Sequence, residues 1–207
     1  MNKFLNALGK PAKWILLIGS ALYALLFAIM TFAQIDGNFF SVMASLIIGV
    51  VGFAVLAAVP LFILLKKENI SKIVFSILAG YWLISSFLGE VGAGYNIDNG
   101  NPGIFNAACV FSFIFGLTLL AVAALLVLSF VLKKDLFRLI ALGALAIAIF
   151  MALVAGILWL SYFGYVKAEY DMNTSWVRVL STICDYFFLP LIVSMGYLYF
   201  YGAPQQD

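Results

Sequence analysis

The chain has 207 residues, of which 66% are hydrophobic and 10% charged, with a formal net charge of +2 and no histidine. Soluble domains are about 45–50% apolar and about 25% charged, so this composition excludes a water-soluble fold and indicates a polytopic membrane protein. The lack of histidine also excludes an imidazole base, a His-ligated haem and a His-bearing zinc site.

A membrane-spanning helix needs about 20 apolar residues to cross roughly 30 Å of hydrocarbon. Six segments reach this length or come close to it: Trp14–Ala33, Phe40–Leu65, Ile70–Leu88, Ile104–Leu132, Leu139–Val166 and Val177–Tyr201. Lipid accommodates only helices or closed barrels, and continuous apolar runs are not typical of barrel strands. We therefore predict an all-α transmembrane bundle of six spanning helices, forming a single domain over residues 1–207.

The stretch before the first segment, Asn2–Ala12, is short and weakly basic, and we expect it to lie on the inner membrane surface. The first segment itself is long for the apolar region of a signal peptide, which is about 7–15 residues. We therefore expect it to be retained as a helix.

Basic residues are distributed unequally between the two sides of the predicted bundle. Nine of the eleven precede the first segment or surround the second and fourth connections: Lys3, Lys10, Lys13, Lys66, Lys67, Lys72, Lys133, Lys134 and Arg138. Only Lys167 and Arg178 lie on the other side. Because cytoplasmic loops carry the excess of lysine and arginine, we expect both termini in the cytoplasm and the chain in the plasma (cell inner) membrane.

The two basic turns also suggest an internal repeat. An offset of 67 residues aligns Lys66 with Lys133 and Gly49 with Gly116. This pattern is compatible with three parallel helical hairpins, over residues 1–65, 66–132 and 133–207. Chance is the alternative, because membrane helices use few residue types and basic turns recur for topological reasons.

Small residues four positions apart allow helix backbones to approach closely in lipid. The fifth segment carries one such row and the second carries another: Ala144, Ala148, Ala152 and Gly156, and Ser41, Ser45 and Gly49. We predict tight packing along both rows, within the bundle or against another subunit. Pro60 in the second segment removes the usual donor to the carbonyl of Leu56 and favours a local kink.

Asp185 is the one acidic residue well inside an apolar segment, where an ionisable group is expensive and should face the bundle, a partner or water. Helical spacing places four residues on one polar face: Arg178, Ser181, Thr182 and Asp185. Pro190 should leave the carbonyl of Tyr186 without its donor. A carboxylate beside such a carbonyl can form a binding site for a proton or a small cation.

Two other segments carry polar residues in their outer halves, namely Asn106 and Cys109 near the outer end of the fourth and Tyr81, Ser85 and Glu90 in the third. If these faces converge, they form a polar notch that is open to the outside. The alternatives for Asp185 are a structural hydrogen bond or ion pair, for example with Arg178, and a contact with a partner subunit. Cys109 and Cys184 are either close enough to pair or remain two buried thiols.

The sequence offers neither a nucleophile and base in catalytic spacing nor a metal or cofactor motif, so we expect no enzyme, no cofactor and no bound metal. It shows no nucleic-acid-binding feature. Two functions remain, and the nearly apolar inner halves of the segments and the small loops favour the first. The first is a non-catalytic subunit or assembly factor of a larger membrane complex, bound to other membrane proteins. The second is a small proton- or cation-coupled transporter, or its substrate-binding component, with an outward-facing small-molecule or ion site at Asp185.

Overall fold

The computed structural model describes residues 2–33, 39–132, 135–170 and 175–201. Within these ranges the chain is helical throughout apart from short connections. The elements in chain order are α1 (Asn2–Ala33), α2 (Phe39–Leu64), α3 (Glu68–Ala93), the short 3-10 helix η1 (Gly94–Asn96), α4 (Gly103–Leu132), α5 (Asp135–Tyr170), α6 (Trp176–Ile183), the π-helix η2 (Cys184–Phe188) and α7 (Leu189–Tyr201).

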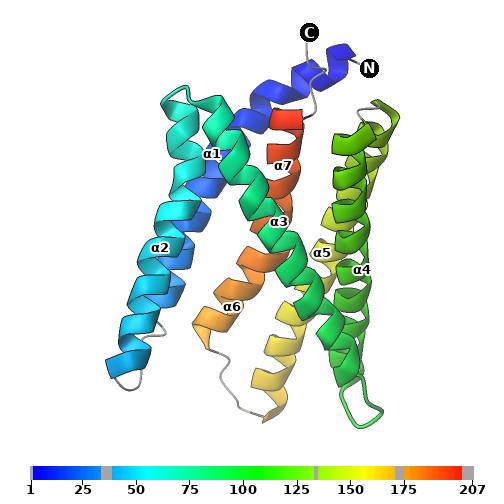
Figure 1. Cartoon of the computed structure of the whole chain (residues 1–207). Coiled ribbons are helices and arrows are strands. Elements are labelled where there is room, and N and C mark those ends of the chain that lie inside the picture. The colour runs from blue at the N-terminus through cyan, green and yellow to red at the C-terminus, as the bar shows by residue number, and fades with distance from the viewer. Residues whose placement is uncertain (1, 34–38, 133–134, 171–174, 202–207) are drawn as a thin grey trace.

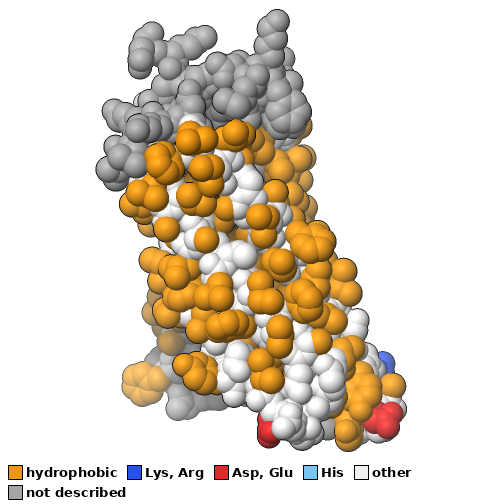
Figure 2. All heavy atoms as spheres, turned by 90° about the vertical axis from the view of Figure 1, so that its right-hand side faces the viewer, with side chains coloured by type: hydrophobic (Ala, Val, Ile, Leu, Met, Phe, Trp, Pro, Cys, Tyr) orange, Lys and Arg blue, Asp and Glu red, His pale blue; other side chains and the backbone are white. Residues whose placement is uncertain are grey.

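The predicted all-α architecture is confirmed for the described residues. Six stretches are long and apolar enough to cross a membrane: Pro11–Ala33, Val42–Leu64, Glu68–Asn96, Gly103–Leu128, Leu139–Tyr170 and Trp176–Tyr201. Figure 2 shows one flank of the molecule covered by hydrophobic side chains along most of its length, while acidic side chains gather at one end. Such a surface suits the hydrocarbon of a bilayer, so the chain is an integral membrane protein.

The helices alternate in direction, so both termini lie at the same end of the bundle, which we call the terminal end; the opposite end is the far end (Figure 1). α1 and α2 form an antiparallel pair at one side, and α4 and α5 form a closely packed pair at the other. α3 crosses between them and contacts α2 and α4, while α7 lies between α1 and α5.

The sixth segment differs from the single regular helix that its hydropathy predicts. It comprises α6, the π-helix η2 and α7, and the backbone N–H of Leu189 bonds to the carbonyl of Cys184, five residues earlier. Pro190 has no N–H to continue the α-helical pattern, and its ring crowds the preceding turn. A wider π turn accommodates this proline, and such turns occur frequently at functional sites.

Two other helices are longer than the apolar runs indicate. α1 is continuous from Asn2, so the basic stretch Asn2–Ala12 forms its first turns, with Pro11 inside the helix. α3 begins at Glu68, whose carboxylate lies in the first turn where the helix dipole favours negative charge. α3 also continues past Leu88 to Ala93, which brings Glu90 into its last turns.

Candidate functional site

A cavity of about 510 Å³ lies between the α1–α2 pair and the helices α3, η2 and α7. Its volume falls in the range of roughly 300–1,000 Å³ that is common for small-molecule sites. The α1 side chains that line it, from Ser20 to Phe27, lie in the middle of the span Pro11–Ala33. The cavity therefore lies near the middle of the membrane and contacts four of the six spanning stretches.

Two carboxylates line this cavity, Glu90 from α3 and Asp185 from η2. Both are partly buried, and the Ser181 hydroxyl, one turn before Asp185, donates to Asp185 Oδ2 at 3.0 Å. No lysine or arginine is among the residues that line the cavity, and neither acid forms an ion pair within the described part of the chain. The site therefore presents uncompensated negative charge when both acids are ionised.

A chain of hydrogen bonds from four helical elements ends on Glu90. Trp159 Nε1 in α5 donates to Ser112 Oγ in α4 at 2.9 Å, and the Ser112 hydroxyl lies 2.9 Å from the Tyr186 hydroxyl. Tyr186 in turn donates to Glu90 Oε2 at 2.7 Å. With Ser112 as the donor to Tyr186, every bond points toward the carboxylate, which fixes its position and stabilises its negative charge.

We predict that Tyr186→Phe lowers the free energy of unfolding by about 1–3 kcal/mol, because partly buried Glu90 loses the hydrogen bond from Tyr186 and the buried Ser112 hydroxyl loses its contact with the Tyr186 oxygen. Equilibrium unfolding in mixed micelles measures this change. Tyr95→Phe is the matched control, since Tyr95 is 89% exposed and should change stability by less than about 0.5 kcal/mol. Equal effects of the two substitutions would show that the hydrogen-bond chain does not stabilise the fold.

Several predicted site residues lie outside the cavity. Arg178 is exposed, and its carbonyl accepts a hydrogen bond from the Thr182 hydroxyl at 3.0 Å. Asn106 holds the loop at the far end, because its side-chain amide donates to the carbonyl of Asp98 at 2.7 Å and accepts from the Asp98 N–H at 3.3 Å. The structure thus brings Asp185, Ser181, Tyr186 and Glu90 together, but not Arg178 or Asn106.

The two rows of small residues occupy different environments. A Cβ on Gly156 would lie 2.5 Å from Cε2 of Phe187 and 2.8 Å from Cβ of Tyr186, so this glycine allows α5 to approach η2. Ala148 and Ala152 in the same row are buried, and Ala144 is partly buried. In α2, a Cβ on Gly49 would meet the Phe32 ring at 3.1 Å, while the side chains of Ser41 and Ser45 lie outside the described residues.

Both cysteines are buried and form no disulfide; Cys109 is in α4 and Cys184 is in η2. The sequence is compatible with a disulfide between them, but the structure places them as two separate thiols. They behave as small apolar side chains within the bundle.

The aromatic lining of the cavity was not identified from the sequence. Tyr23 and Phe27 of α1 face it together with Phe75 and Trp82 of α3. The indole N–H of Trp82 is buried and has no hydrogen-bond partner among the described residues. Aromatic residues in apolar helices usually indicate core packing, so the signal available in the sequence was the serines on the same helix faces, Ser20, Ser85 and Ser86.

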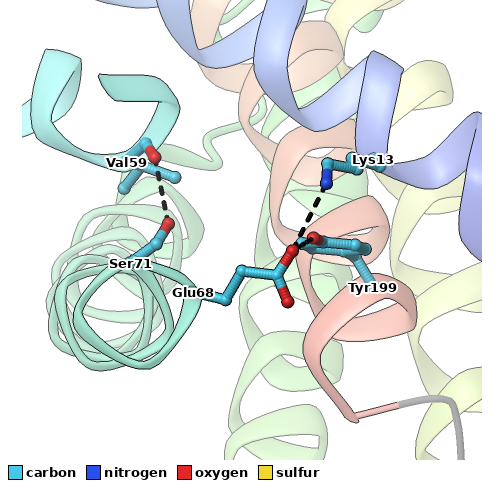
Figure 3. Close-up of polar contacts among 5 residues, drawn as sticks. All are labelled: Lys13, Val59, Glu68, Ser71 and Tyr199. Carbon is cyan, nitrogen blue, oxygen red and sulfur yellow. Dashed lines mark hydrogen bonds and ion pairs between the residues drawn. The ribbon is translucent and has the colours of Figure 1, made fainter. Parts of the chain in front are cut away.

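A second polar cluster lies at the terminal end of the bundle, and we call Lys13, Glu68 and Tyr199 the terminal clamp (Figure 3). Glu68 Oε1 accepts a hydrogen bond from the Tyr199 hydroxyl at 2.6 Å and lies 3.3 Å from Lys13 Nζ. These contacts tie α1, α3 and α7 together. Beside them, Ser71 of α3 donates to the carbonyl of Val59 in α2 at 3.0 Å.

The combination of a mid-membrane acidic cavity, a directed hydrogen-bond chain and a clamp at one end defines the candidate site. Comparison with known proteins adds nothing to this description, since no protein family, curated protein or solved structure matches the chain.

Proposed function

We propose that the chain is a small proton- or cation-coupled transporter, or the substrate-binding membrane component of one, and that the mid-membrane cavity is its binding site. The observation that supports this proposal is the presence of Glu90 and Asp185 in one cavity without a basic partner. Ionisable residues inside membrane segments are costly and generally mark substrate or ion pathways. A purely structural role for both acids would not require a cavity of about 510 Å³ between them and α2.

The excess of basic residues at the terminal end supports an orientation with both termini in the cytoplasm, in the plasma membrane. The terminal clamp then lies on the cytoplasmic side of the cavity. Glu90 and Asp185 lie in the parts of their spans toward the far end, which would face the outside. In this orientation the clamp is the barrier to the cytoplasm, and transport requires it to open.

Alternating access is the property that distinguishes a transporter from a static bundle, and it can be tested before the substrate is known. Ser86→Cys places a thiol at the cavity wall, in a background with Cys109→Ala and Cys184→Ala. A membrane-impermeant, positively charged thiol reagent is applied to right-side-out and inside-out vesicles. We expect labelling from both faces, because each conformation of a transporter exposes the site to one side.

The matched control is Ser161→Cys on α5, where the serine is exposed, does not line the cavity and bonds only to the carbonyl of Ile157. Its labelling reports the reactivity of a thiol on the outer surface of the bundle. Labelling of Ser86→Cys from a single face, or from neither, would contradict the transporter proposal.

The accessory-subunit hypothesis stays a prediction from the sequence. It expects Asp185→Asn to weaken assembly with partner subunits or to have no effect, whereas the transporter proposal expects the same substitution to abolish function. Purification of the protein in mild detergent, followed by mass spectrometry, distinguishes a stoichiometric complex from a protein that is isolated alone.

A further inference from the structure

The wall of the cavity is mostly apolar and aromatic, which limits the kind of molecule that it can hold. Tyr23, Phe27, Phe75, Tyr81 and Trp82 all contribute to it, together with aliphatic side chains of α2 and α7. Small hydrated ions gain little from such a wall. A ligand with a bulky apolar body gains both hydrophobic burial and contact with aromatic faces.

The negative charge of the cavity determines the sign of the charge that a ligand can carry. Among the described residues, Glu90 and Asp185 are the only charged ones that line it, so an anion would be repelled and a cation attracted. Pro60 removes the usual N–H donor to the carbonyl of Leu56, another lining residue, which leaves a further electronegative atom on the α2 side. Aromatic rings add to this preference, because their faces attract organic cations.

Trp82 gives an independent indication that the cavity is built for an occupant. The residue is only 7% exposed, it lines the cavity, and its indole N–H has no partner among the described residues. Buried donors are almost always hydrogen-bonded in native proteins, and each unmet one is costly. A ligand with a hydrogen-bond-accepting atom, or a water that accompanies it, would satisfy this group.

The opening of the cavity lies at the depth of the hydrocarbon. Tyr81 of α3 is 72% exposed and Val55 of α2 is 40% exposed, although both line the cavity. They lie near the middle of the spans Glu68–Asn96 and Val42–Leu64, far from either end of the bundle. Among the described elements α2 contacts only α1 and α3, so the α2–α3 side is not covered by another helix. The entrance therefore faces lipid.

We infer that the cavity binds lipophilic organic cations, and that these enter from the bilayer between α2 and α3. This inference rests on the proposed function in that it takes the cavity to be the substrate site. The carboxylates of Glu90 and Asp185 hold the positive charge, and the aromatic wall holds the apolar body. The ligand class is thus a hydrophobic amine or a comparable onium ion that partitions into membranes.

The test uses two probes of matched size and opposite charge, tetraphenylphosphonium and tetraphenylborate. Equilibrium dialysis measures their binding to the full chain in nanodiscs of uncharged lipid, with empty nanodiscs subtracted. We expect saturable binding of tetraphenylphosphonium and none of tetraphenylborate. Glu90→Gln and Asp185→Asn should each weaken tetraphenylphosphonium binding at least about tenfold, because each removes one favourable charge interaction of about 1.4 kcal/mol or more.

Glu169→Gln and Asp98→Asn are the matched controls, since both acids are exposed and lie outside the cavity. They should leave binding unchanged. Val55→Trp provides a second variant that keeps both carboxylates: a large side chain at the exposed edge should block the entrance and abolish binding. Equal binding of the two probes, or undiminished tetraphenylphosphonium binding in the Glu90→Gln/Asp185→Asn double variant, would overturn the inference.

The result is separable from that of the labelling experiment. Selective tetraphenylphosphonium binding together with labelling of Ser86→Cys from one face only would identify a receptor for lipophilic cations and refute transport. Labelling from both faces without charge-selective binding would support transport and refute the ligand class.

Discussion

Gly196→Ala is expected to lower the free energy of unfolding by about 1–3 kcal/mol, the usual cost of overpacking a filled core. A Cβ on Gly196 of α7 would lie 2.1 Å from Cε2 and 2.2 Å from Cζ of Phe75 in α3. Real Cβ atoms do not approach carbon this closely, so the Phe75 ring has to move. Both residues are buried, and the ring forms part of the cavity wall.

Equilibrium unfolding in mixed micelles measures this effect, with Gly80→Ala as the matched control. A Cβ on Gly80 of α3 meets no atom within 4 Å, so alanine should raise stability there by up to about 1 kcal/mol through helix propensity. Adding Phe75→Leu to Gly196→Ala should recover part of the loss, because the smaller side chain leaves room for the new Cβ. Strictly additive effects of the two substitutions would show that they do not compete for the same space.

Glu68→Ala is expected to increase labelling of Ser86→Cys from the terminal side by about 5- to 30-fold. The substitution removes the acceptor that Tyr199 and Lys13 share in the terminal clamp. The side chains of Lys13 and Glu68 are 39% and 55% exposed, so their ion pair contributes only about 0–1 kcal/mol. The Tyr199 hydrogen bond therefore supplies much of the effect. A total of one to two kcal/mol shifts a two-state equilibrium by this factor.

The control for this experiment is Glu169→Ala, which removes an exposed acid near the far end of α5. It should leave the labelling rate from either side unchanged. Glu68→Gln should give an intermediate increase, because its amide oxygen can still accept from Tyr199 but no longer attracts Lys13. If Glu68→Ala lowers the unfolding temperature without changing the labelling rate, the clamp is a structural contact and not a gate.

The sequence predicted the six spans well because continuous hydrophobicity is the dominant requirement of a membrane helix. It was less accurate at helix ends. The third apolar run stops at Leu88, yet α3 continues to Ala93 because backbone hydrogen bonding carries the helix past polar residues. It also missed the π-helix at Cys184–Phe188, since hydropathy contains no information about hydrogen-bond register.

The candidate site was predictable only where residues are close in sequence. The spacing of Ser181 and Asp185 predicted that they share one polar face, because positions i and i+4 are neighbours on a helix, and the structure shows a hydrogen bond between them. Glu90 was expected on the outer side of the same notch, but its link to Tyr186 depends on how α3 and η2 pack. Asn106, predicted near the outer end of the fourth segment as part of that notch, instead binds the loop at Asp98. The rotation of each helix about its own axis determines which side chains meet, and the sequence of an almost uniformly apolar helix contains little information about that rotation.

The π-helix η2 allows the two parts of the sixth spanning segment, α6 and α7, to face different directions. An α-helix turns by about 100° and rises 1.5 Å per residue. One extra residue in a wide turn therefore rotates the preceding residues by about 100° relative to the helix that follows. α7 packs through Ile192, Val193 and Gly196, while Asp185 lies within the wide turn itself. Deleting a single residue between Asp185 and Leu189 would rotate the acid away from the cavity and leave the packing face of α7 in place. The number of residues in η2 therefore determines which way the Asp185 carboxylate points. The packing face of α7, which anchors the helix, does not depend on that number.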